Sequence, residues 1–181
     1  KVGNVWAEEW QRTDRSFGPL TQKLIAVARS APFAQAIDIG CGAGEISLTL
    51  AAGAPSSHVL GVDISDDLLQ VARVRGKDRP NLRFELANAA NWYAGAAERP
   101  DLVVSRHGVM FFADPTAAFT HIAGQAAPGA RLAFSCFRER ADNIWARELA
   151  SIAPPGEEPA PDPEAPGPFA FGRRERTETL L

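Results

Sequence analysis

Hydrophobic positions along the chain follow two alternating patterns, which predict strands that take turns with helices. Short apolar or β-branched runs indicate buried strands, and apolar residues three or four positions apart indicate amphipathic helices. The predicted strands cover residues 35–39, 58–63, 81–86, 102–104 and 131–137, and the predicted helices cover 16–30, 45–52, 66–75 and 116–127. Ser16 begins the first of these helices and Ser65 precedes the third, and serine is a residue type that caps helix N-termini.

This order of elements favours an α/β fold with a doubly wound, mostly parallel sheet and helices on both faces. Ligands of such sheets bind outside the carboxyl ends of the strands, where the strand order reverses. Acidic residues and glycines follow several of the predicted strands, so a ligand site is expected at that edge.

The C-terminal part differs in composition. Residues 154–168 contain seven prolines in fifteen positions, which excludes helix interiors and central strands. Residues 172–181 have the pattern of the start of a charged helix. We therefore expect a core over residues 1–152, and over 153–181 a proline-rich segment and an incomplete C-terminal part of the same domain.

Composition argues against a nucleic-acid-binding, disulfide-rich, metal-binding or membrane-spanning protein. A chain of 181 residues is an ordinary single domain, and a net charge of -3 gives no basic field for a nucleic-acid partner. Two cysteines form neither a disulfide framework nor a metal set, and no metal site is expected. No apolar run reaches the roughly 18 residues of a membrane span. The prediction is a cytoplasmic protein.

The most informative segment is the glycine turn after the first strand, which reads Asp38-x-Gly40-x-Gly42-x-Gly44. Glycines let backbone N–H groups approach a ligand without Cβ interference. A dinucleotide fingerprint would need its third glycine at position 45, where the chain has Glu45. Asp38 would repel a pyrophosphate but can receive the ammonium of an amino-acid moiety. The alternative is that this acid only braces the turn.

Two further strand ends carry candidate nucleoside contacts. Asp63 ends the second strand and can accept hydrogen bonds from two ribose hydroxyls, although it could instead cap a helix. Asn88 and Ala89 follow the third strand, where the Asn88 carbonyl oxygen could accept from an adenine amino group. A surface turn is the alternative for these two residues.

Residues 105–112 follow the fourth strand and are expected to line the pocket floor. His107 could act as a general base for an acidic substrate oxygen, because its ordinary pKa lies near 6.5. A lone histidine in a loop is more often a packing or rim residue. Trp6 and Trp10 are four positions apart, a spacing that places them on one helical face, either as a lid or simply docked on the domain.

Residues 38–44, 61–65, 105–115 and 128–134 together resemble the class I S-adenosylmethionine (SAM) dependent methyltransferases, in their type-11, UbiE-like branch. The resemblance implies a Rossmann-like fold, SAM as cofactor with S-adenosylhomocysteine as product, and a small-molecule methyl acceptor. It also implies cofactor contacts from Asp38, Gly40, Cys41, Gly42, Gly44, Asp63, Ile64, Asn88, Ala89, Ser105 and Arg106. Asn88 departs from the family, which often has an acid there.

The resemblance further implies seven strands in the order 3-2-1-4-5-7-6. Strands six and seven should follow the proline-rich segment and are missing from the 181 residues. Without them the fifth strand would be an exposed edge. We expect that they are omitted from the sequence or that the protein is truncated; the alternative is a partner that covers the edge.

The predicted function is transfer of the sulfonium methyl to O, N or C of a small acceptor (EC 2.1.1 class), chiefly by alignment of the reacting atoms. A general base is optional, and no catalytic residue is assigned beyond His107 as a candidate. A homodimer is a further expectation. The alternatives are an NAD(P)-dependent oxidoreductase and a SAM-binding protein without catalysis.

Overall fold

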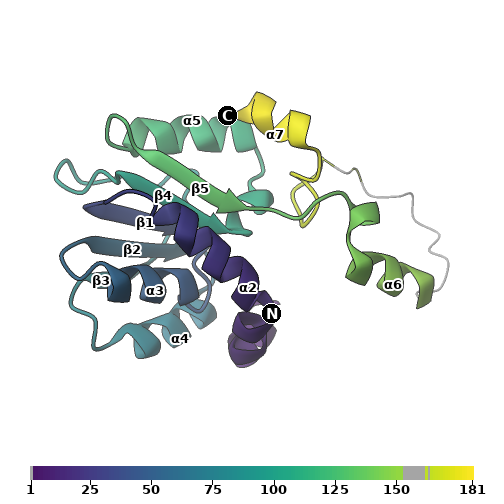
Figure 1. Cartoon of the computed structure of the whole chain (residues 1–181), viewed down its shortest axis with the longest axis horizontal. Helices are drawn as coiled ribbons and strands as arrows, with labels where there is room; N and C mark the ends of the chain where they lie inside the picture. Colours follow the sequence, from purple (N-terminus) through teal and green to yellow (C-terminus); the bar gives the residue numbers. More distant parts are fainter. Residues whose placement is uncertain (1, 153–161, 163) are drawn as a thin grey trace.

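The computed structural model describes residues 2–152, 162 and 164–181 (Figure 1). The strands are β1 (Gln35–Ile39), β2 (His58–Asp63), β3 (Leu82–Leu86), β4 (Leu102–Arg106) and β5 (Arg131–Ser135). The helices are α1 (Val2–Glu8), α2 (Trp10–Ala28), α3 (Glu45–Gly53), α4 (Asp66–Gly76), α5 (Pro115–Gln125), α6 (Ile144–Ile152) and α7 (Arg174–Leu180), with short 3-10 turns η1 (Gly108–Phe111) and η2 (Arg140–Asp142).

The five strands form one parallel sheet in the order β3-β2-β1-β4-β5. This confirms the predicted doubly wound α/β fold and its strand order. The chain moves outward from β1 to β3 and then returns to place β4 on the other side of β1, so the order reverses between β1 and β4. Asp38 lies opposite Gly61 on one side and Val104 on the other. The carboxyl ends of all five strands therefore lie at one edge of the sheet, and the strand order reverses there between β1 and β4.

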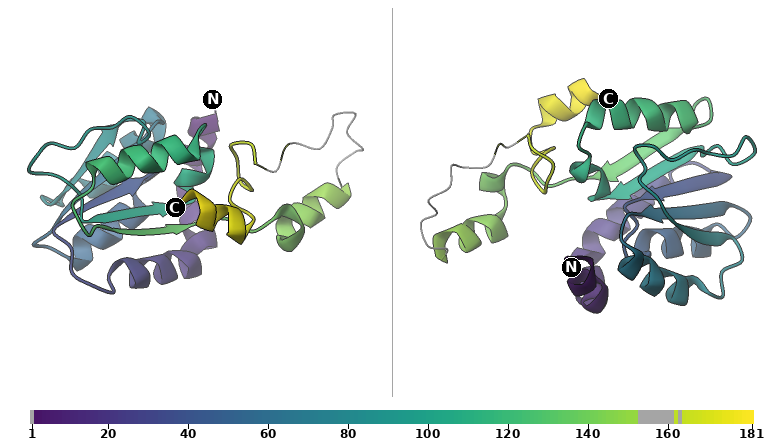
Figure 2. Two further views of the ribbon diagram at one scale, coloured as in Figure 1. Left: turned by 90° about the horizontal axis from the view of Figure 1, so that it is seen from above. Right: turned by 180° about the vertical axis from the view of Figure 1, so that it is seen from behind.

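Side chains that alternate along the strands build two cores, one on each face of the sheet. On one face α2 and α3 pack through Leu24 and Leu50 against Val59 and Val104. On the other face Phe119 of α5 packs with Ile37. Figures 1 and 2 show α2, α3 and α4 on one side of the sheet, α5 on the other, and α6 projecting away from it.

The N-terminal prediction was wrong in its boundaries. The helix predicted to start at Ser16 is α2, which begins at Trp10, so Ser16 is an exposed residue inside the helix and not its cap. Trp6 and Trp10 do not share one helix, because α1 ends at Glu8 and α2 begins at Trp10. Trp6 is 51% exposed, while Trp10 packs against the Arg75 side chain. The contacts that hold the first half of α2 come from residues distant in sequence, which local periodicity does not reveal. Ser65 does cap α4, because its Oγ accepts from the Leu68 N–H at 3.5 Å.

The proline-rich prediction over residues 154–168 falls mostly outside the described residues. From residue 164 onward the chain returns to the sheet: the Gly167 N–H donates to the Met110 carbonyl at 3.0 Å, and Phe171 is buried in the core with Phe119. The predicted charged helix is α7. Among the described residues β5 is an edge strand of the sheet, and no helix there is long and apolar enough to cross a membrane.

Candidate functional site

The glycine turn between β1 and α3 bends through three glycines with left-handed backbone. Gly40, Gly42 and Gly44 have φ angles of 65°, 55° and 85°, values that a residue with a Cβ adopts only at a cost. The N–H groups of Gly40 and Cys41 donate to the Val62 carbonyl at 2.9 and 3.0 Å. These two N–H groups are therefore satisfied within the protein, and at this part of the turn glycine serves the backbone shape. Ligand contact by the N–H groups of the turn stays a prediction.

The three glycines face different surroundings. A Cβ on Gly40 would lie 2.7 Å from the Gly108 Cα, and one on Gly44 would lie 2.8 Å from the Phe84 ring, so both face protein. A Cβ on Gly42 would meet nothing within 4 Å. Gly42 thus marks the open side of the turn, where a ligand can approach the backbone.

Asp63 stands beside this opening in a fixed orientation. One carboxylate oxygen accepts from the Gly42 N–H at 2.8 Å and the other from the Ser65 N–H at 2.9 Å. A carboxylate oxygen has a second lone pair, so each can still accept a hydroxyl hydrogen. The neighbouring Ile64 is 76% exposed and supplies an apolar surface at the same edge.

Asp38 lies beneath the turn. Its side chain is 1% exposed, and its Oδ2 accepts from the Ser47 N–H at 3.1 Å and the Ser47 hydroxyl at 2.6 Å. Burial raises the pKa of Asp38 to about 6, and the Ser47 hydrogen bonds oppose that rise. Its Oδ1 has no hydrogen-bond partner within the part of the chain that the structure describes. Through Oδ2 the acid braces the start of α3 beneath the turn. Its predicted role toward a ligand ammonium stays a prediction.

The turn after β4 packs directly on the glycine turn. The Ser105 hydroxyl donates to the Ile39 carbonyl at 2.7 Å and accepts from the Gly108 N–H at 3.1 Å and the Val109 N–H at 3.2 Å. A Cβ on Gly108 would lie only 2.4 Å from the Ile39 carbonyl oxygen. Sequence reasoning missed Gly108, although a glycine just after the fourth strand was a readable signal. The buried Ser105 side chain serves the two turns, so a contact to a cofactor would come from its backbone.

His107 has left-handed backbone, with φ 68°, and no other non-glycine residue in the described ranges has a positive φ. Its ring stacks on Phe137 with centroids 4.3 Å apart and meets the edge of Phe17 at 5.0 Å. Burial, and secondly the Arg106 charge, lower the pKa of His107 to about 4. The imidazole is therefore neutral at pH 7 and a weak base, as expected for a packing residue.

The remaining predicted contacts also lie at the carboxyl edge. The Arg106 guanidinium is paired with Glu45 at the start of α3. The Asn88 Oδ1 accepts from the Ala90 N–H at 3.0 Å in an exposed turn, while Ala89 is buried. Cys41 is buried in the glycine turn, and burial raises the pKa of its thiol, so it is a packing residue there. The structure thus brings all eleven predicted cofactor residues to one edge, where some side chains face the opening and others support it.

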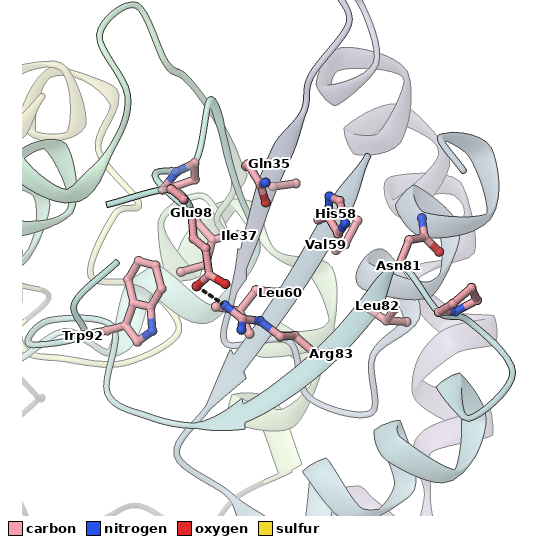
Figure 3. A pocket seen from close by; sticks show the side chains of 14 residues that line it. Gln35, Ile37, His58, Val59, Leu60, Asn81, Leu82, Arg83, Trp92 and Glu98 are labelled. Carbon is pink, nitrogen blue, oxygen red and sulfur yellow. Dashed lines mark hydrogen bonds and ion pairs between the residues drawn. The ribbon is translucent and has the colours of Figure 1, made fainter. Parts of the chain in front are cut away.

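A cavity of about 340 Å³ lies elsewhere, on the sheet face that also carries α5 (Figure 3). Gln35, His58 and Asn81 line it from the amino-terminal starts of three strands, and the exposed Arg83–Glu98 ion pair crosses it at 2.6 Å. It is therefore at the opposite end of the strands from the glycine turn. No helix forms between β3 and β4, which leaves this face partly open. In the described ranges no three His, Cys, Asp or Glu side chains gather as metal ligands would.

Comparison with known proteins agrees with this geometry. The family model of the methyltransferase domain matches residues 36–129. The chain is 36% identical over 120 residues to the trans-aconitate 2-methyltransferase of Methylobacterium radiotolerans, covering 66% of this chain and 44% of the relative. It is 30% identical over 160 residues to the enzyme of that name from Variovorax paradoxus, covering 88% and 56%. The chain thus spans about half the length of these relatives.

Among solved structures, the N-methyltransferase NodS of Bradyrhizobium japonicum in complex with S-adenosylhomocysteine superposes with a TM-score of 0.60. Sequence identity is 20%, and the match covers 73% of this chain and 65% of NodS. At that identity the likeness concerns the fold, which is the arrangement that supports the glycine turn described above.

Proposed function

Because the chain belongs to the methyltransferase-domain family and has the class I methyltransferase fold, we propose that it binds SAM at the carboxyl edge of the sheet and transfers its methyl group to a small molecule. The observation that carries the proposal is the open side of the turn at Gly42, next to the oriented carboxylate of Asp63. A Cβ would fill that space, so the turn fits a ligand held close to its backbone.

Each part of the edge then has a role. Asp63 would accept the two ribose hydroxyls, and the exposed Ile64 with Asn88 would flank the adenine. Asp38 would act from below by holding Ser47 and the start of α3. When bound, SAM supplies an already activated sulfonium methyl, so the protein has mainly to align an acceptor with it.

His107 is proposed as a wall of the acceptor pocket. Its stacking on Phe137 and its lowered pKa suit a neutral packing surface better than a strong general base. Alignment alone can supply most of the acceleration when the acceptor is itself a good nucleophile. We propose no catalytic base within this chain.

Two measurements test the proposal. Calorimetric titration with S-adenosylhomocysteine and with NADH should show binding of the first and not of the second; the reverse would overturn it. Transfer of labelled methyl from SAM to a panel of acceptors should then give a product, and trans-aconitate belongs in the panel because two relatives carry its name. Binding without transfer to any acceptor would favour the SAM-binding protein without catalysis. The comparisons give no support to the oxidoreductase alternative. Homodimer formation and cytoplasmic location stay predictions.

A further inference from the structure

Arg75 joins α2 to the glycine turn. It lies in the last turn of α4, where its Nη1 donates to the Ala43 carbonyl inside the glycine turn at 2.7 Å. Its Nη2 donates to Asp14 Oδ2 of α2 at 2.7 Å, and its guanidinium carbon lies 3.9 Å from the centre of the Trp10 ring. One side chain thus holds a carbonyl of the turn and two residues of α2.

Asp14 also contacts a second arginine at the same site. Its Oδ1 lies 3.6 Å from Arg106 Nη2. The Nη1 of Arg106 donates to the Thr21 hydroxyl at 2.7 Å and to the Glu45 carboxylate at the start of α3. Asp14 therefore lies between two arginines. Arg75 binds the glycine turn at Ala43, and Arg106 binds Glu45 just after the turn.

This set of charges is shielded from water and balanced. The side chains of Asp14, Arg75 and Arg106 are 15%, 19% and 13% exposed. With Glu45 the set holds two cations and two anions, and partly buried pairs are screened by salt far less than surface pairs. Removal of Asp14 would leave excess positive charge in a partly buried place, which costs more than loss of a surface pair.

We propose that Asp14 is a positioning residue that couples the docking of α2 to the affinity of the glycine turn for its nucleoside ligand. The second half of α2 is fixed independently, because Leu24, Ile25 and Ala28 are buried in the core. The first half is held by Arg75 and Arg106, and at Phe17 also by the rings of His107 and Phe137. When the first half of α2 undocks from the domain, both arginines lose Asp14 as their shared partner. The backbone at Ala43 is then less restrained.

Thermodynamic linkage makes the effect reciprocal: if docking of α2 raises ligand affinity, ligand must stabilise the docked helix by the same factor. S-adenosylhomocysteine should then slow hydrogen exchange of residues 10–17, although these residues need not touch it. This inference rests on the proposed cofactor site, which must exist for the coupling to be seen.

The test compares D14N and R75A with a matched control, R73A. Arg73 lies on the same helix and pairs with Asp66 at 3.2 Å, but its side chain is 44% exposed and that pair does not involve the turn. By calorimetry, D14N and R75A should bind S-adenosylhomocysteine at least about fivefold more weakly than wild type, whereas R73A should bind as wild type does. R75K keeps the charge but loses the planar guanidinium whose two nitrogens reach Ala43 and Asp14, so its affinity should lie between R75A and wild type.

The possible outcomes separate the two ideas. Absence of binding by the wild-type protein would overturn the proposed function itself. Binding by wild type with equal affinity in D14N, R75A and R73A would overturn the coupling alone. If the variants do not fold, hydrogen exchange on the wild-type protein decides: ligand-induced protection of residues 10–17 supports the coupling, and unchanged exchange rejects it.

Discussion

At the scale of single residues, the three glycines of the turn differ in their surroundings: Gly40 and Gly44 face protein atoms, and Gly42 does not. Gly42 faces open space, so the G42A variant should fold, with a loss of about 1 kcal/mol for its left-handed backbone. The added methyl would occupy the ligand side, and S-adenosylhomocysteine affinity should fall roughly tenfold or more, a difference of about 1.4 kcal/mol or more. Calorimetry and thermal unfolding measure the two effects separately.

Gly129 provides the matched control for that prediction. It too is left-handed, with φ 77°, and a Cβ there would meet nothing within 4 Å, but it lies before β5 at the opposite edge of the sheet. G129A should cost a similar free energy of unfolding and leave ligand affinity unchanged. Equal affinity in G42A and G129A would show that the open side of the turn is not where the ligand lies.

At position 108 glycine is required because neighbouring backbone atoms leave no room for a Cβ, and not because of its backbone angle. Its Cβ would lie 2.4 Å from the Ile39 carbonyl oxygen and 2.8 Å from the Gly40 Cα, both backbone atoms that cannot turn away. G108A should therefore force the two turns apart and lower the free energy of unfolding by about 1–3 kcal/mol. Denaturant unfolding measures this, and G124A, on α5 where a Cβ meets nothing within 4 Å, should be at least as stable as wild type, because alanine favours a helix more than glycine does. An unchanged G108A would mean that the turns can separate freely.

At the scale of elements, one amide ties three of them together. The Asn81 Nδ2 donates toward the carbonyls of Ala51, Ala54 and Ser57 at 3.1, 3.2 and 2.9 Å, linking the end of α3 to the starts of β2 and β3. N81A should lower the free energy of unfolding by about 1–3 kcal/mol, because carbonyls lose their donor. N81D should cost more, since a carboxylate offers these oxygens no donor and repels them.

Chemical denaturation at pH 7 checks the order of the Asn81 variants, wild type above N81A above N81D. Asn91, which is exposed in the β3–β4 connection, is the control position. N91A should leave the unfolding free energy unchanged. Equal stability of N81A and N81D would contradict the role assigned to the donated hydrogens.

The element scale also shows what the sequence could predict. Strand positions followed from short apolar runs, because residues such as Val59 and Val104 are buried between the sheet and its covering helices. The start of α2 could not be predicted, since Asp14 is held by Arg75 and Arg106, 61 and 92 positions along the chain. The glycine turn was recognisable from spacing, but only packing against Gly108 and Phe84 reveals that two of its glycines face protein.

At the scale of the whole molecule, two buried groups give opposite pH dependences of stability. The pKa of His107 is lowered from 6.5 to about 4, so between these values the unfolded chain binds the extra proton and stability rises with pH. The pKa of Asp38 is raised from 3.8 to about 6, so in that window the folded chain binds the extra proton and stability falls as pH rises. The two groups therefore oppose each other in the wild-type protein between about pH 4 and 6.

Variants at His107 and Asp38 should separate the two opposing pH dependences of the unfolding free energy. We expect the stability of wild type minus that of H107N to increase from pH 4 to 6.5 and then level off; asparagine is chosen because it tolerates left-handed backbone. Wild type minus D38N should decrease from pH 4 to 6 and then level off. Urea unfolding at half-unit steps of pH measures both differences, in which contributions from all other groups cancel. A flat difference for D38N would mean that Asp38 is ionised in the folded protein despite its burial, and Ser47 would then be a strong enough donor to hold the charge beneath the glycine turn.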